Sequence, residues 1–312
     1  MSFTTQIKHE LSNYELKDCC KKSQLSALLL YNGILNIHHN KFFLEIRVEN
    51  VNVVKKIWKL IKELYDINCE LAVSKKLKLK KNNIYILRLY DRAIDILDSL
   101  NIYKNGIICN PNLGFLKKDC CIRSYLAGVF MSKGSCNAPT KSDYHLEMTS
   151  SEFSYSKFVR KLILRYNINC KLIKRRNDHV VYIKAAQDIG DFLKLVKAYD
   201  SLLSFENIRI NKDFINSITR LDNCEGANEI KVLNTADRHL EDINFIEKHQ
   251  QIDFLNSKLK QVVVLRKKFP EASLLELTNE YESLYGNKIS KSGLKHRFDK
   301  LNMIVRKLKE DK

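Results

Sequence analysis

The stretch Leu126-Ala-Gly-Val-Phe-Met-Ser-Lys-Gly134 decides the fold, because a similar stretch, Leu25-Ser-Ala-Leu-Leu-Leu-Tyr-Asn-Gly33, stands about one hundred residues before it. Both stretches are apolar, contain small residues and end on glycine. Two further pairs of segments match in the same order: Phe43-Leu-Glu-Ile46 with His145-Leu-Glu-Met148, and Ile67-Asn-Cys-Glu-Leu71 with Ile168-Asn-Cys-Lys-Leu172. These matches predict a duplication, with repeats at about residues 23–118 and 119–222.

Each repeat has the same predicted order of elements. It opens with a short apolar helix whose final glycine suits a C-cap. Two strands follow, including 41–48 and 143–148, and then an amphipathic helix at 53–64 and 158–166. Two more strands end at 84–89 and 180–184, and helices at 93–100 and 189–198 complete the repeats. The sequence therefore predicts an α+β fold, in which a duplicated αββαββα scaffold with antiparallel sheets precedes an all-α domain.

The composition favours a polyanionic partner. The 312 residues carry a net charge of +18, which suits DNA, RNA or an anionic membrane surface. The abundance of Lys, Ile and Asn offers the alternative of an AT-rich genome. No run of 18 apolar residues is present, and the polar N-terminus does not resemble a signal peptide, so we expect no membrane partner and a cytoplasmic location.

The nine cysteines predict no disulfide framework. Two adjacent pairs occur, Cys19-Cys20 and Cys120-Cys121, but the sequence holds no C-x-x-C. A reducing cytoplasm is the simplest interpretation. Because histidines and cysteines do not cluster at ligand spacing, we expect no metal site, and no cofactor is indicated.

A compact basic module near the C-terminus predicts a helix-turn-helix. The segment 220–228 links it to the scaffold, and residues 229–248 look helical. Ser273 and Glu276 have the spacing of a capping box, Gly286-Asn287 breaks the helix, and Ser290 is a second N-cap candidate. Apolar residues recur at helical spacing: Leu255, Leu259, Val262 and Val263; Leu274, Leu277 and Tyr281; Leu294, Phe298, Leu301 and Val305.

The last of these helices predicts a DNA-reading face. A recognition helix presents polar residues near its N-terminus to base edges and basic groups to phosphates. Gly293 would let the backbone approach DNA closely, and an ordinary amphipathic helix with solvated lysines is the alternative. The candidate DNA-binding residues are Ser273, Ser290, Lys291, Ser292, Gly293, Lys295, His296, Arg297 and Lys300.

The duplicated scaffold resembles the LAGLIDADG homing endonucleases, with Leu126, Ala127, Gly128 and Gly134 at the positions of the motif. The resemblance implies that the two motif helices pack together and that the sheets form a saddle over DNA. Small residues would allow the close approach: Ser26, Ala27, Ala127 and Gly128. Candidate saddle contacts are basic residues near equivalent turns: Lys75, Lys76, Lys78, Lys80 and Lys81 in one repeat, and Lys174, Arg175 and Arg176 in the other.

The catalytic acids of that family are missing. Their positions hold Asn32 and Lys133, and a lysine cation repels the divalent metal that such enzymes need. We therefore expect no catalytic residues and no enzyme activity. The matched strand carboxylates Glu45 and Glu147 are the alternative source of metal ligands, although a structural role suits them better.

Across nearly the whole chain, the sequence resembles the WhiA family of bacterial regulators. The resemblance is carried by residues 125–135, Tyr144-His-Leu-Glu147, Arg220 to Asn228, Pro270-Glu-Ala-Ser-Leu274 and, most specifically, Ile289-Ser-Lys-Ser-Gly-Leu-Lys-His-Arg-Phe298. It implies a degenerate LAGLIDADG scaffold joined to a sigma-factor-like helix-turn-helix, and roles in sporulation, cell division or chromosome segregation. The spacer at 279–287 is somewhat expanded relative to the tightest family pattern.

Taken together, the sequence predicts a scaffold domain at 1–222, a linker and helix at 223–254, and a helix-turn-helix domain at 255–312. The predicted function is sequence-specific regulation through double-stranded DNA, with a nucleoid-associated location. Two alternatives stay open: an active homing-type endonuclease, and a non-catalytic scaffold that binds a transcription or cell-division protein.

Overall fold

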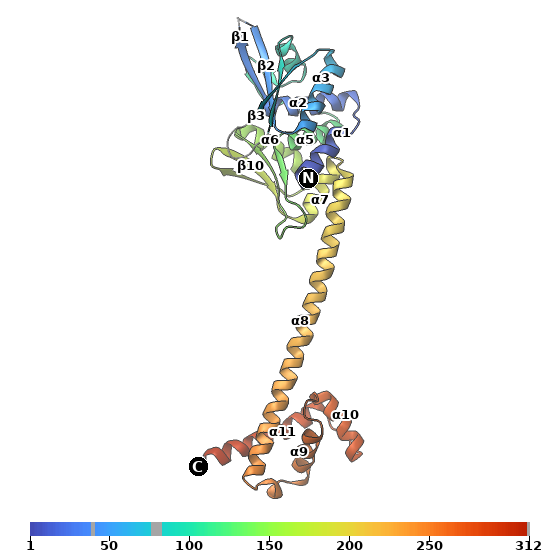
Figure 1. Ribbon diagram of the computed structural model, residues 1–312, viewed down its shortest axis with the longest axis vertical. Coiled ribbons are helices and arrows are strands. Elements are labelled where there is room, and N and C mark those ends of the chain that lie inside the picture. Colours follow the sequence, from blue (N-terminus) through green and yellow to red (C-terminus); the bar gives the residue numbers. More distant parts are fainter. Residues whose placement is uncertain (39–40, 76–82, 311–312) are drawn as a thin grey trace. The chain divides into compact units, whose positions relative to one another are not determined.

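A computed structural model describes residues 1–38, 41–75 and 83–310 (Figure 1). The chain forms two compact units, residues 1–212 and 213–312, and the division falls within helix α8 (Tyr199–Lys248). The boundary expected near residue 222 lies within the same helix. Four predicted saddle residues, Lys76, Lys78, Lys80 and Lys81, lie outside the described residues.

The first unit contains the predicted duplication, and the order αββαββα is confirmed in both repeats. The first repeat comprises α2 (Asp18–Asn32), β1 (Gly33–His38), β2 (Lys41–Val48), α3 (Val51–Tyr65), β3 (Glu70–Lys75), β4 (Asn83–Leu89) and α4 (Ala93–Ser99). The second comprises α5 (Asp119–Lys133), β7 (Gly134–Cys136), β8 (Leu146–Ser150), α6 (Phe153–Leu164), β9 (Lys171–Arg175), β10 (Asp178–Ile183) and α7 (Ala186–Leu195).

The two sheets have the same topology. Their strand orders are β1-β2-β4-β3 and β7-β8-β10-β9, and every pairing is antiparallel. In β2 the apolar Leu44 and Ile46 are buried in the core, whereas Arg47 between Ile46 and Val48 is exposed. Because alternate residues of a strand point to opposite faces, each sheet packs one face against helices and turns the other toward solvent.

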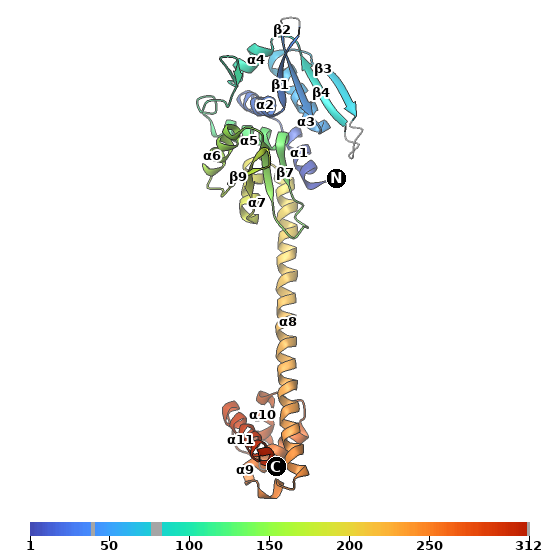
Figure 2. The ribbon, with the colours of Figure 1, turned by 90° about the vertical axis from the view of Figure 1, so that its left-hand side faces the viewer.

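The motif helices α2 and α5 lie side by side in both views (Figures 1 and 2). A Cβ atom built on Gly128 would lie 2.7 Å from the Gln24 carbonyl oxygen and 2.8 Å from the Ala27 Cβ. The close approach predicted for Ala27 and Gly128 is therefore confirmed. Ser26 has a different role, because its hydroxyl donates to the carbonyl oxygen of Leu100 at 3.1 Å.

The glycines that end the motif helices are required because there is no room for a side chain, and not because of an unusual backbone conformation. Gly33 and Gly134 are C-caps as expected, but both have extended backbones, with φ of −86° and −81°. A Cβ on Gly33 would lie 2.5 Å from the Leu29 carbonyl oxygen, and one on Gly134 would lie 2.4 Å from the Phe130 ring. A side chain at either position would force the helix and the following strand apart.

Several elements were not predicted from the sequence. Helix α1 (Phe3–Asn13) buries Phe3, Ile7 and Leu11, and a small hairpin pairs β5 (Tyr103–Lys104) with β6 (Ile107–Ile108). The segment 220–228, predicted to be a link between domains, is helical and belongs to α8.

The second unit is built from the C-terminal part of α8 and a compact helical module. The module comprises the 3-10 turn η1 (Ile252–Phe254) and helices α9 (Ser257–Lys268), α10 (Leu274–Tyr285) and α11 (Lys291–Glu310). Its core contains Ile243, Ile246, Leu255, Leu259, Val262, Val263, Leu265, Leu277, Tyr281, Leu294, Phe298, Leu301 and Val305. Of the apolar stripes predicted here, every residue except Leu274 is buried, and Leu274 packs against the same core. Among the described residues, no helix is long and apolar enough to span a membrane.

Candidate nucleic-acid interface

Helix α10 begins and ends where the sequence predicts. The Ser273 hydroxyl accepts from the Glu276 backbone N–H at 3.2 Å, and the Glu276 carboxylate accepts from the Ser273 N–H at 2.7 Å. This reciprocal pair is the predicted capping box. At the other end, Gly286 adopts a left-handed φ of 68°, a conformation that costs glycine little.

The start of α11 is fixed in a similar way. The Ser290 hydroxyl accepts from the Gly293 N–H at 3.1 Å and lies 3.0 Å from the Ser292 hydroxyl. A Cβ on Gly293 would lie 3.2 Å from the Ser290 Oγ and 3.3 Å from Ile289. The absence of a side chain at Gly293 thus makes room for the cap itself, and Ser273 and Ser290 both serve as helix caps.

The first three turns of α11 present a polar and basic face. Leu294 and Phe298 are buried beneath it, 0% and 2% exposed. Lys291, Ser292, Lys295, His296 and Lys300 are exposed. Within the described residues, none of the three lysines takes part in an ion pair. The helix therefore offers free ammonium groups and small polar side chains together, the combination that reads a groove and its phosphates.

Arg297 differs from these neighbours because its guanidinium has partners inside the unit. It is half-buried, donates to the Tyr281 hydroxyl at 2.9 Å, and lies 5.1 Å above the centre of the Tyr281 ring. The Tyr281 hydroxyl donates in turn to the Gln261 side chain at 2.7 Å. This chain of contacts joins α11, α10 and α9, so Arg297 has a structural role in addition to any contact with DNA.

The turn between α9 and α10 is organised by Arg266, which the sequence did not single out. Its side chain is only 1% exposed. One terminal nitrogen donates to the carbonyl oxygens of Phe269, Pro270 and Ala272, at 3.3, 3.3 and 2.6 Å. Burial lowers the pKa of Arg266 to about 10, which still leaves it charged at neutral pH.

His239 of α8 completes this buried cluster. Its ring stacks on Phe298 with centroids 3.8 Å apart, and its Nδ1 lies 3.5 Å from the Arg266 guanidinium. Burial, together with the charges of Arg266 and Arg238, lowers the pKa of His239 to about 4. A neutral imidazole can accept from Arg266 and pack flat on the Phe298 ring at physiological pH.

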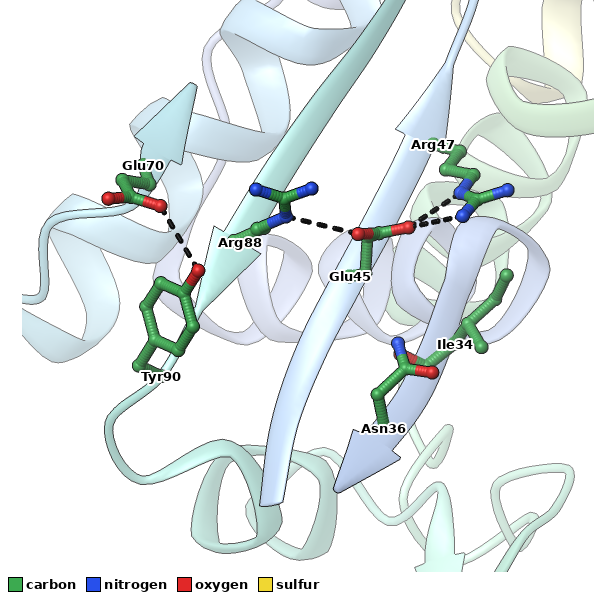
Figure 3. A network of polar contacts seen from close by, with 7 residues as sticks. All are labelled: Ile34, Asn36, Glu45, Arg47, Glu70, Arg88 and Tyr90. Atoms are coloured by element: carbon green, nitrogen blue, oxygen red, sulfur yellow. Dashed lines mark hydrogen bonds and ion pairs between the residues drawn. The ribbon is translucent and has the colours of Figure 1, made fainter. Parts of the chain in front are cut away.

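On the solvent face of the first sheet, Glu45 is bound by arginines on both sides (Figure 3). Arg47 Nε donates to Oε1 at 2.6 Å, and Arg88 Nε donates to Oε2 at 3.1 Å. Burial alone would raise the pKa of Glu45, but these two hydrogen-bonded guanidinium groups lower it overall. The neighbouring Tyr90 hydroxyl donates to Glu70 at 3.1 Å, and Ile34 and Asn36 of β1 flank the network in Figure 3.

Glu147 occupies the matching place in the second sheet. Arg175 makes two contacts of 3.1 Å with its carboxylate, and the His145 Nε2 lies 3.0 Å from Oε2. Burial works to raise the pKa of Glu147, but the hydrogen bonds from Arg175 and His145 lower it overall. Both strand carboxylates are thus paired with cations of their own sheet, as expected for a structural role.

The positions of the missing catalytic acids border a cavity of about 870 Å³ at the C-terminal ends of the motif helices. Asn32 is buried, and its amide donates to the Leu28 carbonyl and the Ser132 hydroxyl, both at 2.8 Å. Lys133, Lys8 and Arg47 also line this cavity, together with Glu49. Burial and the charge of Lys133 lower the pKa of Lys8 to about 8, although Glu49 raises it. The lysines therefore give this cavity excess positive charge.

The described saddle residues do not share one face. Arg175 pairs in register with Asp178, on the solvent face that Glu147 also occupies, and Arg176 sits in the following turn with φ of 58°. Lys174 and Lys75 lie on the other face of their sheets, away from the glutamates, and both are exposed at strand ends. Arg175 is occupied by Glu147, so the predicted basic surface is less uniform than the sequence indicates.

The expectation that the cysteines would not gather is wrong. The Sγ atoms of Cys19, Cys20, Cys120 and Cys121 all lie within 4.8 Å of one another, at the N-terminal ends of α2 and α5. Adjacent cysteines do not have the usual ligand spacing. The two cysteine pairs are 101 positions apart, which is also the offset of the internal repeat. This match is the signal that could have revealed the cluster.

Three family models match consecutive parts of the chain. They are the WhiA N-terminal LAGLIDADG-like domain at residues 18–103, the WhiA LAGLIDADG-like domain at 122–215 and the WhiA C-terminal HTH domain at 218–305. The probable cell division protein WhiA of Bacillus mycoides is 40% identical over 311 residues, which covers 99% of this chain and 98% of the relative. The protein of the same name from Bacillus pumilus is 41% identical over the same shares.

A solved structure has the same fold. The crystal structure of full-length DUF199/WhiA from Thermatoga maritima superposes with a TM-score of 0.61, at 24% sequence identity, over 98% of this chain and 99% of that one.

Proposed function

Because the chain belongs to the WhiA family, we propose that it is a sequence-specific DNA-binding regulator whose recognition element is the N-terminal half of α11. The observation that carries this proposal is the exposed face of α11, where Lys291, Lys295 and Lys300 lie free of ion pairs within the described residues. Capped helices and a buried core hold this face in place. Phosphate contacts would come from the lysines, and base contacts from Ser292 and His296.

The regulated process we propose is transcription linked to cell division. The curated relatives carry the name of probable cell division protein, and they match this chain over nearly its full length. Chromosome segregation and sporulation are the other processes that a regulator of this family would serve. A DNA-binding regulator of this kind acts in the cytoplasm, in association with the nucleoid.

We also propose that the first unit is not an enzyme. Hydrolysis of a phosphodiester on this scaffold needs carboxylates that hold divalent metal between the motif helices. The cavity there contains the neutral amide of Asn32 and the cations Lys8 and Lys133. Arg47 also lines it but is paired with Glu45, and Glu49 supplies an opposing carboxylate. Such a cavity repels a divalent cation and attracts a phosphate. The scaffold would then contribute weak, sequence-independent contacts with the DNA backbone.

The domain limits that fit this division of roles are 1–222 for the scaffold and 255–312 for the reading domain, with 223–254 between them. Limited digestion with trypsin tests them. The exposed Lys231 and Arg238 of α8 should be early sites of cleavage that leave both domains intact. A first cut inside either domain would contradict these limits.

Two assays test the function. Genome-wide crosslinking should recover discrete sites, and a mobility-shift assay should confirm them with purified protein. A protein that retards no DNA would support the alternative of a scaffold for a protein partner. Supercoiled plasmid carrying a bound site should stay uncut with magnesium or manganese. Metal-dependent nicking that is lost in the Glu45→Gln/Glu147→Gln variant would favour the endonuclease alternative.

A further inference from the structure

Four thiols meet at one end of the paired motif helices. Cys19 and Cys20 lie in the first turn of α2, and Cys120 and Cys121 lie in the first turn of α5. Their Sγ atoms all lie within 4.8 Å of one another. Cys20 and Cys121 are buried, and Cys19 and Cys120 are partly exposed. The cluster lies at the opposite ends of these 15-residue helices from Asn32 and Lys133, so it is separate from the cavity of the missing nuclease site.

The protein backbone holds this cluster together symmetrically. The Cys20 thiol donates to the Cys120 carbonyl oxygen at 3.6 Å, and the Cys121 thiol donates to the Cys19 carbonyl oxygen at 3.7 Å. The Ser124 hydroxyl crosses the interface in the same place, donating to the Cys20 carbonyl oxygen at 2.9 Å. These contacts hold the side chains of Cys20 and Cys121 and the backbones of Cys19 and Cys120 across the helix pair, so the cluster is formed by the fold itself.

The spacing of the thiols suits one tetrahedral ion. Zinc–sulfur bonds of about 2.3 Å place the four sulfurs of a tetrahedral site about 3.8 Å apart. Cys19 Sγ and Cys20 Sγ are already 4.0 Å apart, and no pair exceeds 4.8 Å. Side-chain rotations that move the sulfur atoms by a fraction of an ångström to about one ångström would close the site around a single ion. An iron–sulfur cluster distributes its thiolates over several iron atoms and needs wider spacing.

The surroundings suit the charge of such a site. Four thiolates around one divalent ion carry a net charge of −2. The amino-terminal ends of both α2 and α5 meet here, and a helix N-terminus favours negative charge. Lys17 and Lys118 are the N-cap residues of the two helices. Lys197 and Arg123 line a small cavity of about 30 Å³ that Cys20 and Cys120 also border. The acids of the same first turns, Asp18 and Asp119, are paired with Lys21 and Arg123, so their charges are balanced locally.

We propose that Cys19, Cys20, Cys120 and Cys121 bind one zinc ion, which joins the two repeats at the N-terminal ends of the motif helices. Two ligands come from each repeat, so the ion fastens the repeats to one another. All four positions are filled by thiolates, which leaves no open site for substrate, and the role is structural. This site does not depend on the proposed DNA-binding function.

Metal analysis of the untagged full-length protein, purified under reducing conditions without chelator, tests the proposal. About one zinc per chain is expected by mass spectrometry of the metals. The Cys20→Ser/Cys120→Ser variant should lose it, whereas the matched Cys109→Ser/Cys224→Ser variant, which changes cysteines outside the cluster, should retain it. Zinc retained by the first variant, or lost equally from both, would overturn the assignment.

A second measurement uses only the unaltered chain, in case the cluster variant does not fold. Reduced metal-free protein is titrated with cobalt, which should give sulfur-to-cobalt charge-transfer bands and the visible bands of a tetrahedral thiolate site, and zinc should displace them. Addition of zinc should also raise the midpoint of thermal unfolding of the first unit. A protein that contains no zinc as purified and binds neither metal, or that is isolated with these thiols oxidised to disulfides, would contradict the proposal.

Discussion

The two units differ in whether the charged side chains on their surfaces are paired. On the solvent faces of the sheets, Glu45 and Glu147 are bound by arginines of the same sheet, so much of the local charge is balanced internally. On α11, the lysines lie exposed and without ion pairs within the described residues, above a core of apolar side chains. Charges already paired contribute little attraction to a new partner, whereas unpaired ones can bind phosphates. The difference supports the proposal that the second unit reads DNA and that the first contributes a framework with, at most, weak contacts to the DNA backbone.

The largest effect is expected on the exposed face of α11. The triple variant Lys291→Ala/Lys295→Ala/Lys300→Ala should lower affinity roughly a thousandfold, at about tenfold for each lost phosphate contact, and should weaken binding to all DNA sequences alike. Fluorescence anisotropy with labelled DNA measures it. Arg306→Ala/Lys307→Ala/Lys309→Ala, on the last turns of the same helix, removes the same number of charges as the matched control and should retain most of the affinity. Equal losses for both would mean that general charge, rather than this face, binds DNA.

Next in size is the loss of the turn that supports that face. Arg266→Ala should lower the free energy of unfolding of the second unit by about 3 kcal/mol, because three buried carbonyl oxygens lose their donor. Hydrogen exchange over α9 to α11 reports on this unit separately. Lys267→Ala, whose side chain pairs with Glu247 at a more exposed position, is the control and should cost less than about 1 kcal/mol. If Arg266→Ala lowers the free energy of unfolding no more than Lys267→Ala does, then Arg266 does not stabilise the turn.

The paired carboxylates of the saddle should matter for stability and not for DNA affinity. Glu45→Gln should destabilise the first unit by about 1–2 kcal/mol, because it leaves Arg47 and Arg88 without their counter-ion. The effect of Glu147→Gln should be smaller, since that side chain is 18% exposed compared with 8% for Glu45. Chemical unfolding followed through Trp58, the single tryptophan, measures both. A large loss of DNA affinity with no loss of stability would instead place these carboxylates in the DNA interface.

Near neutral pH the smallest effect is a dependence of the stability of the second unit on pH. The pKa of His239 falls from 6.5 to about 4 on folding. Between these values the unfolded chain binds a proton that the folded chain excludes, so stability decreases as pH falls through this window. The slope should be at most about 1.4 kcal/mol per pH unit, because one proton is taken up on unfolding, and smaller to the extent that solvent screens the partly buried imidazole. Hydrogen exchange of α11 from pH 7 to pH 4.5 should show it, and His239→Phe should flatten it; an unchanged slope in the variant would assign the effect to other groups.

Much of the fold follows from local signals in the sequence. The duplication is visible in the two motif stretches, and the caps of α10 follow from Ser273, Glu276 and Gly286, because capping depends on neighbouring residues. Predictions that depend on distant contacts were less successful. Arg266 looks like one more basic residue until the turn folds over it. The segment around Gly226 contains a helix-weakening residue, and yet α8 runs through it without interruption.

The candidate sites show the same difference between local signals and distant contacts. The exposed residues of α11 were predicted from helical periodicity, which states which side chains share a face. That Arg297 is held by Tyr281 could not be read from spacing, since it depends on how two helices cross. The four cysteines illustrate this most clearly, because each adjacent pair is uninformative alone and the cluster exists only through the pairing of the two repeats.

The central claim is that α11 reads DNA, and site-specific photocrosslinking tests it most directly. A photoreactive benzophenone side chain is introduced at Ser292 or His296 on the proposed reading face, and at Met303 of the same helix, which is 58% exposed but lies beyond that face. With a bound DNA site, irradiation should yield protein–DNA crosslinks from positions 292 and 296 and few from 303. Crosslinks from 303 alone, or from none of the three while DNA remains bound, would contradict the account.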